Sequence, residues 1–379
     1  MLVRRVLARR MSHEGNRMLH APVEQREQQI FSGNTVIQRT PPSLSCVVAA
    51  NGNPQGTVLV SRDTRNYNDL ARTGGEMGRL DGKIAAITGA GRGIGRECAL
   101  LMASEGAKIV VNDLGGNADG TGTGHIADDV VAEIQAAGGE AVSNTASVAE
   151  VAGGESLLAT ALEAFGGMDI LLNNAGILRD RTIFKMEEAD WDAVLAVHLK
   201  GHYCCSRPFA RYIRENNRTG CRIMNFSSVS GLFGNFGQSN YGAAKAGIAG
   251  FTRVLALELA KYGCTVNTIS PGALTRMTIP LMEARGEEVA QENLDQGGPQ
   301  HVAPICTWLA SEASAGITSQ IFHASGGAVA IMQQPKVIKQ FNKDGLWTLD
   351  ELDQVVPQLV AAREANDAAA RETGAPVTL

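Results

Sequence analysis

The sequence of 379 residues has no apolar run of the roughly 18 to 20 residues that a helix needs to cross a bilayer. It also has no C-x-x-C pair, and its seven cysteines are scattered except for the neighbours Cys204 and Cys205. The first absence excludes a membrane-spanning helix, and the second argues against a zinc ribbon or a disulfide framework. We therefore expect no membrane partner, no bound metal and a reducing, cytoplasmic compartment.

Aromatic residues are scarce and lysine is unevenly distributed. Aromatics make up 5% of the chain against 43 glycines, which is typical of many tight turns between small-residue strands and helices. Residues 1–79 hold eleven arginines, six acids and no lysine, so they carry +5. Because the net charge is −5, the remaining 300 residues carry −10. An acidic main part argues against nucleic acid as a partner.

The first 79 residues show little periodic pattern. The opening MLVRRVLARRMS resembles an arginine-rich transit peptide, but glutamates follow at positions 14, 24 and 27. Residues 20–76 contain turn formers and no sustained strand or helix period. Met77 comes shortly before the first strong strand pattern. Our hypothesis is that residues 1–79 are a disordered extension, or that the protein begins at Met77.

From Lys83 onward, short β-rich runs alternate with helical stretches. The expected strands are 83–88, 108–112, 140–143, 169–173, 221–226, 265–269 and 320–323. The expected helices include 93–105, 125–137, 155–165, 191–216 and 241–262. This alternation predicts an α/β fold over residues 80–333, a Rossmann-type doubly wound parallel sheet with both faces covered. Ligands of such sheets bind at the carboxyl ends of the strands.

A helical tail is expected over residues 334–379. Thr348 and Glu351 have the spacing of a capping box, which predicts a helix start. We expect Pro357 to break or restart that helix, because proline has no N–H to donate.

A glycine-rich loop, Thr88-Gly-Ala-Gly-Arg-Gly-Ile-Gly95, joins the first expected strand to the first expected helix. It does not match G-x-G-x-x-G, because the sixth position is Ile94, but it matches the related T-G-x-x-x-G-x-G. Gly89, Gly93 and Gly95 allow a tight turn and a close approach of backbone to a pyrophosphate at the helix N-terminus. The alternative, a flexible glycine-rich turn, is weaker because a strand and a helix flank the loop.

The end of the second expected strand carries a carboxylate. Asp113 lies eighteen residues after Gly95, close to the ~20 residues expected for an acid that binds the adenosine ribose hydroxyls. A 2′-phosphate there would meet a like charge, so we favour NAD over NADP. Arg92 is the opposing observation, because a guanidinium in the loop could pair with that phosphate. A solvated loop charge explains Arg92 equally well.

Tyr241 and Lys245 stand four residues apart at the start of an expected helix, so they share a face. Lowering the pKa of a phenol from about 10 to about 7 takes ~4 kcal/mol. An ammonium at ~4 Å supplies about that much at an effective dielectric constant of ~20. Such a phenol could exchange a proton with an alcohol while hydride moves to or from nicotinamide. Ser228, thirteen residues before Tyr241, could hold the substrate oxygen.

Together these motifs closely resemble the classical short-chain dehydrogenase/reductase family over about residues 80–330. The resemblance rests on Thr88 to Gly95, Asn173-Asn-Ala-Gly176, Ser228, Tyr241-x-x-x-Lys245 and Pro271-Gly272. Residues 111–116, 174–181 and 191–201 look most like the 3-hydroxyacyl-CoA dehydrogenase domain of peroxisomal multifunctional enzymes and their bacterial relatives. This likeness implies NAD, a secondary alcohol as small-molecule substrate, and a homotetramer or homodimer.

The resemblance also implies roles for particular residues. It makes Ser228, Tyr241 and Lys245 the catalytic set. Pro271 and Gly272 would flank the nicotinamide, with Thr275 or Thr278 nearby. The implied cofactor-binding residues are Thr88, Gly89, Arg92, Gly93, Ile94, Gly95, Asp113, Ser147, Val148, Asn174, Ala175, Gly176, Tyr241, Lys245, Pro271, Gly272 and Thr275.

Two positions depart from the family pattern. His198 stands where the family commonly has an asparagine that holds a water linked to the active-site lysine, so we regard His198 as a further candidate catalytic residue. His198 and His202 also have a spacing that can chelate zinc, but no third ligand is evident. At Ala146-Ser147-Val148 many relatives have an aspartate that touches adenine, so adenine contacts here should be weaker or made by backbone.

The pattern after Pro271-Gly272 predicts a long polar loop over residues 277–300 that could close over ligands. Leu274, Met277, Ile279, Leu281 and Met282 could give it an apolar wall, or could anchor the loop. The favoured function is an NAD-dependent oxidoreductase of a hydrophobic secondary alcohol, such as a hydroxyacyl or steroid compound. The alternatives are an NADPH-dependent 3-ketoacyl reductase and a non-catalytic nucleotide-binding scaffold.

Overall fold

The computed structural model describes residues 77–275, 277–279 and 290–372. The chain divides into two units, one of residues 65–337 and one that contains residues 338–378. Of residues 1–79, the structure describes only 77–79, so it does not test the hypothesis about this segment. Leu281 and Met282 of the expected apolar wall also lie outside the described residues.

The first unit is built on one eight-stranded sheet in the order β3-β2-β1-β4-β5-β6-β7-β8. All neighbouring strands are parallel except β7 and β8. The strands are β1 (Ile84–Thr88), β2 (Lys108–Asn112), β3 (Ala141–Asn144), β4 (Ile170–Asn173), β5 (Arg222–Phe226), β6 (Thr265–Gly272), β7 (Ile321–Ser325) and β8 (Ala328–Ile331). The predicted Rossmann-type doubly wound fold is confirmed.

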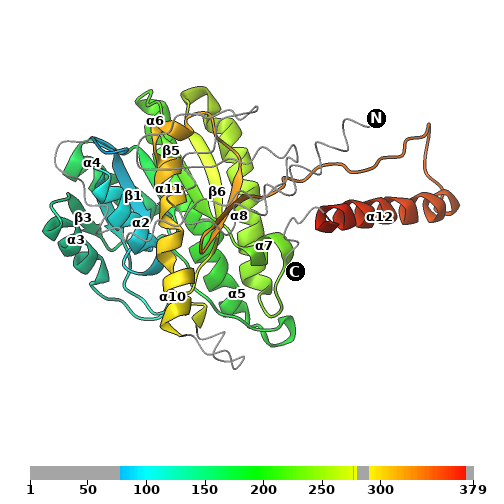
Figure 1. Cartoon of the computed structure of the whole chain (residues 1–379), viewed down its shortest axis with the longest axis horizontal. Helices are drawn as coiled ribbons and strands as arrows, with labels where there is room; N and C mark the ends of the chain where they lie inside the picture. Colours follow the sequence, from blue (N-terminus) through cyan, green and yellow to red (C-terminus); the bar gives the residue numbers. More distant parts are fainter. Residues whose placement is uncertain (1–76, 276, 280–289, 373–379) are drawn as a thin grey trace, which may run out of the picture. The chain divides into compact units, whose positions relative to one another are not determined.

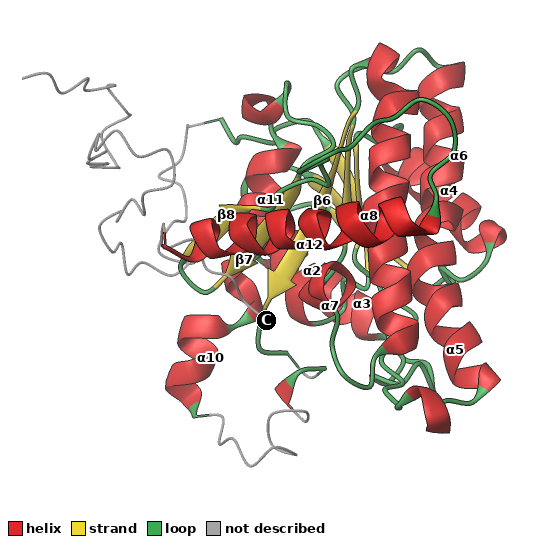
Figure 2. Cartoon of the chain, turned by 90° about the vertical axis from the view of Figure 1, so that its right-hand side faces the viewer, coloured by secondary structure: helices red, strands yellow, loops and turns green. Residues whose placement is uncertain are grey.

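Helices cover both faces of the sheet (Figures 1 and 2). On one face, α2 (Gly93–Ser104), α3 (Ile126–Ala136) and α11 (Ala303–Ala310) share a core with side chains such as Ile87, Val111 and Ile269. On the other, α4 (Val151–Phe165), α6 (Gly201–Glu215) and α8 (Ser239–Leu259) pack on side chains such as Val110, Leu171 and Val266. Apolar runs buried on both faces are what a central parallel sheet requires.

The expected helix over residues 191–216 is three consecutive segments instead of one. They are α5 (Glu188–Leu195), a π-helical turn η4 (Ala196–Lys200) and α6. A π turn inserts an extra residue into the helical ladder, and such bulges often mark functional sites. Here the turn carries His198.

Shorter segments complete the first unit. They are the helices α7 (Val229–Phe233) and α10 (Gln291–Gly297) and the 3₁₀ turns η3 (Ile183–Lys185), η5 (Ala260–Tyr262), η6 (Pro299–His301) and η7 (Glu312–Ser314).

Strand β8 was not predicted. It pairs antiparallel with β7 across the two-residue turn Gly326-Gly327, and Gly326 has φ +52°. Glycine pairs are typical of such hairpin turns because they adopt positive φ without strain. All four β8 residues are exposed, so the strand lacks the buried apolar pattern by which the other strands were found.

The second unit contains α12 (Leu349–Glu372). Its predicted capping box is present: the Thr348 N–H donates to Glu351 Oε2 at 2.8 Å, and the Glu351 N–H donates to Thr348 Oγ1 at 3.3 Å. The predicted break at Pro357 is wrong, because the helix continues through it. Pro357 is exposed, so water can reach the backbone carbonyl that the missing N–H leaves open.

Candidate active site

The glycine-rich loop has the conformation that its sequence requires. Gly89 and Gly93 have φ values of +65° and +55°, which favour glycine. At Gly95 a Cβ would come within 2.3 Å of the Gly89 carbonyl oxygen, so a side chain there would break the turn. Arg92 is the extended residue from which α2 begins. The N-terminus of α2 therefore opens from a compact turn, an arrangement suited to an anion.

The loop is tied to the end of β4. The Thr88 hydroxyl accepts hydrogen bonds from the N–H groups of Asn174 and Ala175, both at 3.0 Å. The Asn174 side chain donates in return to the carbonyl oxygens of Thr88 and Gly89 at 3.0 and 3.1 Å. These bonds hold residues 174–176 as a wall beside the glycine-rich loop.

The Asp113 carboxylate lies next to the same loop. Its Oδ2 accepts from the Gly91 N–H at 3.0 Å and its Oδ1 from the Gly115 N–H at 2.8 Å. The side chain is partly exposed and lines a cavity. A carboxylate is thus held at the end of β2, where the sequence placed it.

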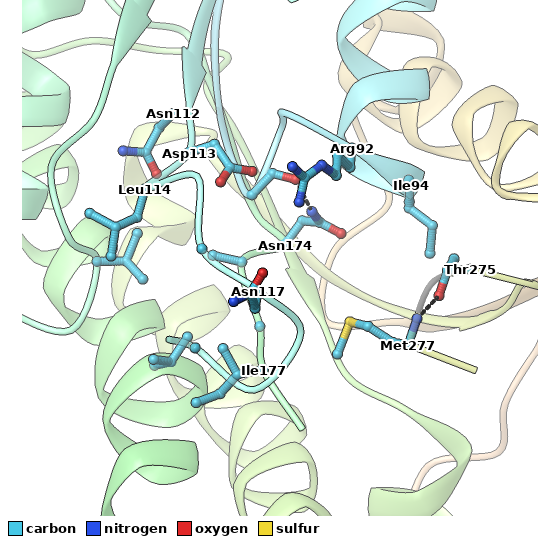
Figure 3. A pocket seen from close by; sticks show the side chains of 18 of the residues that line it. Arg92, Ile94, Asn112, Asp113, Leu114, Asn117, Asn174, Ile177, Thr275 and Met277 are labelled. Atoms are coloured by element: carbon cyan, nitrogen blue, oxygen red, sulfur yellow. Dashed lines mark hydrogen bonds between the residues drawn. The ribbon is translucent and has the colours of Figure 1, made fainter. Parts of the chain in front are cut away.

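The cavity has a volume of about 440 Å³, in the range of small-molecule sites. Figure 3 shows Asn112, Asp113 and Leu114 toward one end and Thr275 and Met277 toward the other. Eleven predicted cofactor-binding residues line it: Gly89, Arg92, Gly93, Ile94, Asp113, Ser147, Val148, Asn174, Ala175, Gly176 and Thr275. Leu274, Met277 and Ile279 of the expected apolar wall line it as well.

Other predicted residues lie outside this lining. Thr88 bonds to Asn174 and Ala175, and Gly95 packs against the Gly89 carbonyl oxygen, so both stabilise the loop without lining the cavity. Pro271 and Gly272 belong to β6, where they pair with Ala324 and Ser325 of β7. Strand β6 runs three residues further than expected, so the Pro-Gly pair is part of the sheet and not of the loop after it.

The sequence interpretation missed one segment of the wall. Leu114, Gly116, Asn117 and Gly120, from the connection between β2 and α3, line the cavity. The segment is anchored by the Leu178 N–H, which donates to the Ala118 carbonyl at 2.9 Å. The glycine-rich run Leu114-Gly-Gly-Asn-Ala-Asp-Gly-Thr-Gly-Thr-Gly124 was the signal that could have identified it.

Ser228, Tyr241 and Lys245 come together outside the cavity lining, and Tyr241 is linked to that lining through His198, which contacts its ring and abuts Gly176. Lys245 Nζ lies 5.4 Å from the centre of the Tyr241 ring and donates to the Phe226 carbonyl oxygen at 2.6 Å. The Ser228 hydroxyl lies close enough to the Tyr241 phenol to act against the rise of its pKa, and it accepts from the Ser230 N–H at 3.2 Å. The three predicted side chains therefore share one site.

The electrostatics of this cluster differ from the expected effect of Lys245 on Tyr241. Burial raises the pKa of Tyr241 to about 12, against the opposing hydrogen bond from Ser228, and the charge of Asp180 raises it further. Burial lowers the pKa of Lys245 to about 7. In the protein alone, burial is the largest effect on both groups, because each charged form loses water. The expected drop in the phenol pKa is therefore absent here.

His198 packs against Tyr241. The two ring centres are 5.1 Å apart and edge to face. Its Nε2 lies 3.1 Å from the Ile177 nitrogen and 2.8 Å from the Ile177 oxygen, whereas its buried Nδ1 has no hydrogen-bond partner among the described residues. A Cβ on Gly176 would come within 2.3 Å of the imidazole, so only glycine there leaves room for the ring. Burial, then the charge of Lys245, holds the pKa of His198 well below its usual value.

Comparisons with known proteins agree with this geometry. The sequence model of the short chain dehydrogenase family matches residues 83–286, more than half of the chain.

The chain belongs to the short-chain dehydrogenase family.

This short-chain dehydrogenase is 39% identical to hydroxyacyl-CoA dehydrogenase ChsB1 of Mycobacterium tuberculosis over 292 residues, 75% of the chain and 90% of ChsB1. It is 44% identical to peroxisomal multifunctional enzyme type 2 of Drosophila melanogaster over 254 residues, 67% of the chain and 40% of that protein. The crystal structure of a short chain dehydrogenase from Mycobacterium avium matches with a TM-score of 0.66 and 43% identity, covering 75% of this chain and 97% of that one.

Membership of the family makes the protein a nicotinamide-dependent oxidoreductase acting on CH–OH groups, and it confirms the resemblance stated from the motifs. A nicotinamide dinucleotide fits the residues present: a glycine turn opening a helix, a carboxylate at the end of β2 and a cavity that joins them. Within the described ranges, no helix is long and apolar enough to cross a membrane.

The second histidine of this short-chain dehydrogenase is fully bonded to backbone. His202 Nδ1 donates to the His198 carbonyl oxygen at 2.6 Å, and Nε2 accepts from the Phe226 N–H at 3.2 Å. Burial lowers the pKa of His202 to about 3, so the ring is neutral at ordinary pH. Among the described residues, no three His, Cys, Asp or Glu side chains are grouped to hold a metal ion.

Proposed function

We propose that this enzyme interconverts a hydrophobic secondary alcohol and its ketone, with NAD as the bound dinucleotide and Tyr241 as the group that exchanges the proton. The observation that carries the proposal is the contact of Tyr241 with both Ser228 and Lys245 beside a cavity that begins at the glycine-rich loop. The dinucleotide supplies the hydride acceptor or donor when it is bound.

Each catalytic side chain has a distinct role. The Ser228 hydroxyl, which contacts the phenol, holds the substrate oxygen within reach of Tyr241. Lys245 favours the ionised phenol whenever it carries its proton, and its pKa of about 7 means that small changes in its surroundings decide that charge. His198 is neutral, so we assign it the positioning of Tyr241 through the edge-to-face contact.

The preference for NAD rests on Asp113. A carboxylate fixed by two backbone N–H groups cannot turn away from the ribose edge of the cavity. It can accept from a ribose hydroxyl, but it would repel a 2′-phosphate. Arg92, which also lines the cavity, supports the alternative of NADPH and a 3-ketoacyl substrate.

The substrate class follows from two kinds of support. The apolar residues Leu274, Met277 and Ile279 line the Thr275 end of the cavity. The similar ChsB1 is named a hydroxyacyl-CoA dehydrogenase. We therefore assign a hydroxyacyl thioester as the first substrate to test, with a steroid alcohol as the second.

We further propose a homotetramer or homodimer that works in the cytoplasm. Val254 and Leu257 are 54% and 79% exposed on α8, and burying such side chains against a second copy would stabilise an assembly. Light scattering of the purified protein tests the oligomer, since a monomeric mass would overturn that part. Fractionation of the native cells tests the compartment.

The cofactor experiment compares NAD⁺ and NADP⁺ in calorimetric binding and in turnover of a 3-hydroxyacyl-CoA. We expect NAD⁺ to bind at least about tenfold more tightly, and Asp113→Asn to reduce that ratio because it removes the like charge. Lys336→Met, an exposed lysine outside the cavity lining, is the matched control and should leave the ratio unchanged. Equal or tighter binding of NADP⁺ would favour the 3-ketoacyl reductase, and binding without any turnover would favour a non-catalytic scaffold.

A further inference from the structure

A half-buried carboxylate near Tyr241 has no part in the reaction proposed above. It belongs to Asp180, in the connection between β4 and η3. Its Oδ2 accepts a hydrogen bond from Gln238 Nε2 at 2.7 Å, whereas its Oδ1 is buried and has no hydrogen-bond partner in the described part of the chain. A buried carboxylate oxygen without a donor is costly, so the position of this group calls for an explanation.

The start of α8, the helix that carries Tyr241, holds Asp180 in place. Gln238, the donor to Asp180, is buried and immediately precedes α8. The buried Asn240 donates from Nδ2 to the Arg179 carbonyl oxygen at 3.0 Å, and its Oδ1 accepts from the Tyr241 N–H at 2.7 Å. The segment that contains Asp180 is thus bonded to the first turn of α8, so the carboxylate keeps a fixed position relative to the phenol.

The charge of Asp180 acts at the place where the substrate alcohol would react. It raises the pKa of Tyr241, in addition to the larger effect of burial. A raised pKa of a phenol means that a negative charge on its oxygen is disfavoured. The same repulsion acts on any other anion held at that oxygen. It would act on a substrate that carries a carboxylate two bonds from its alcohol carbon.

Neighbouring cations compensate this charge only in part. Arg181 Nη1 donates to the backbone oxygen of Asp180 at 2.9 Å and not to its carboxylate, and Arg179 Nε donates to another backbone oxygen at 2.9 Å. Burial lowers the pKa of Lys245 to about 7, so near neutral pH this lysine carries only about half a charge. An anionic substrate would therefore meet Asp180 with little help from these three side chains.

We propose that Asp180 is a specificity-determining residue that excludes substrates with a free carboxylate beside the reacting alcohol, and so restricts the enzyme to neutral compounds such as 3-hydroxyacyl thioesters. This inference rests on the proposed function. A 3-hydroxy acid and its esters share the reacting carbon, but only the free acid brings a second negative charge toward Asp180. Repulsion between like charges a few ångström apart at a partly buried site corresponds to a preference of about a hundredfold.

The test compares methyl 3-hydroxybutyrate with 3-hydroxybutyrate as substrates of the full-length enzyme, followed by NAD⁺ reduction. Because burial raises the pKa of Asp180, the assays run at about pH 8, above the usual range for carboxyl groups. We expect the wild type to prefer the ester about a hundredfold in kcat/KM, and Asp180→Asn to lower that preference to about tenfold or less. Asparagine has the same shape and can still accept from Gln238.

Two further variants control the experiment. Asp180→Ser also removes the charge and can accept from Gln238, so it should lower the preference in the same way if the asparagine variant does not fold. Asp192→Asn removes an exposed carboxylate on α5, where water screens the charge, and should keep the wild-type preference.

Two results would overturn the inference. One is a wild type that oxidises the free acid as efficiently as the ester. The other is an Asp180 variant with the wild-type melting temperature and an unchanged preference, which would mean that the charge of Asp180 does not reach the substrate. If the enzyme oxidises neither 3-hydroxybutyryl-CoA nor the ester, the proposed function itself is wrong, so the two failures are distinguishable.

Discussion

Charged side chains are paired differently at the two ends of the strands in the central sheet, here called the amino edge and the carboxyl edge. At the amino edge, the Asp169 carboxylate pairs with Arg218 and accepts from the Ile84 N–H, and the nearly buried Arg222 meets Glu312, which also binds Lys83. At the carboxyl edge, Lys245 is buried and donates to a carbonyl, while His198 Nδ1 and Asp180 Oδ1 are buried without hydrogen-bond partners among the described residues.

The difference separates polar groups that support the fold from those to which we assign a part in the reaction. Buried polar groups are normally satisfied, so each unsatisfied one needs an explanation. At the amino edge, opposite charges pair and so lower the free-energy cost of burial. At the carboxyl edge, Lys245 and His198 are buried without an opposite charge in the described part of the chain, so their pKa values lie below the usual ones. Variants at the first edge should therefore change stability, and variants at the second should change activity or its pH dependence.

The largest effect is expected from Tyr241→Phe at the carboxyl edge. Removing the hydroxyl to which we assign the proton exchange should reduce kcat/KM about a thousandfold. The ring and its contact with His198 remain, so the dinucleotide affinity and the melting temperature should stay close to those of the wild type. Steady-state kinetics, calorimetry and thermal unfolding measure the three quantities. Tyr262→Phe, a tyrosine of η5, is the control, and full activity of the Tyr241 variant would contradict the assignment.

Arg222→Met should give the largest loss of stability at the amino edge. The arginine side chain is 2% exposed and donates to the Gly220 and Cys221 carbonyl oxygens at 2.7 and 3.2 Å. We expect a loss of about 3 kcal/mol in unfolding free energy, because buried carbonyls lose their donor. Denaturant unfolding measures it, with the exposed Arg363→Met as control. If the loss of unfolding free energy is as small as that of the control, the hydrogen bonds of Arg222 do not stabilise the amino edge.

Lys245→Met tests the burial of an ammonium through the pH dependence of stability. The pKa of Lys245 is lowered to about 7 in the folded protein, so the unfolded chain binds the proton more tightly. This group therefore opposes folding fully below pH 7, and the opposition fades as pH rises toward the unfolded pKa of about 10.4. The unfolding free energy of the variant relative to wild type should fall by roughly 2 kcal/mol between pH 7 and pH 9.

The comparison between variant and wild type is needed because the buried cysteines titrate in the opposite direction. Burial raises the pKa of Cys205 and Cys221 to about 12 and about 11, which lowers stability at high pH in both proteins equally. Lys261→Met, which replaces an exposed lysine in η5, is the control. A flat difference for Lys245→Met would mean that the lysine keeps an ordinary pKa.

The smallest effect is expected from Glu312→Gln. Its side chain is 65% exposed, so its pairs with Lys83 and Arg222 are screened by water. We expect a loss of less than about 1 kcal/mol, shrinking further in high salt. Urea unfolding at low and high salt measures it. A loss that equals that of Arg222→Met would show that the ion pair, and not the carbonyl contacts, holds the buried arginine.

Much of the fold could be predicted because its signals are local. The seven predicted strands were found because buried parallel strands are continuous apolar runs, and the glycine-rich loop and the i, i+4 spacing of Tyr241 and Lys245 need no distant partner to be recognised. Strand β8 and the helix through Pro357 were missed for the opposite reason. An exposed strand such as β8 needs no alternating or continuous apolar pattern. At the exposed Pro357, water can bond to the carbonyl oxygen that has lost its N–H partner.

The sequence by itself determined the sheet, the position of the glycine turn and the choice of the three side chains to which we assign catalysis. Only the tertiary structure decided their ionisation, the contact of His198 with Tyr241 and the hydrogen bond that ties Asp180 to Gln238. The physical reason is that periodicity and residue spacing report interactions between residues that are close together in the sequence. Loss of water and the pairing of polar atoms depend on which distant residues fold against each other.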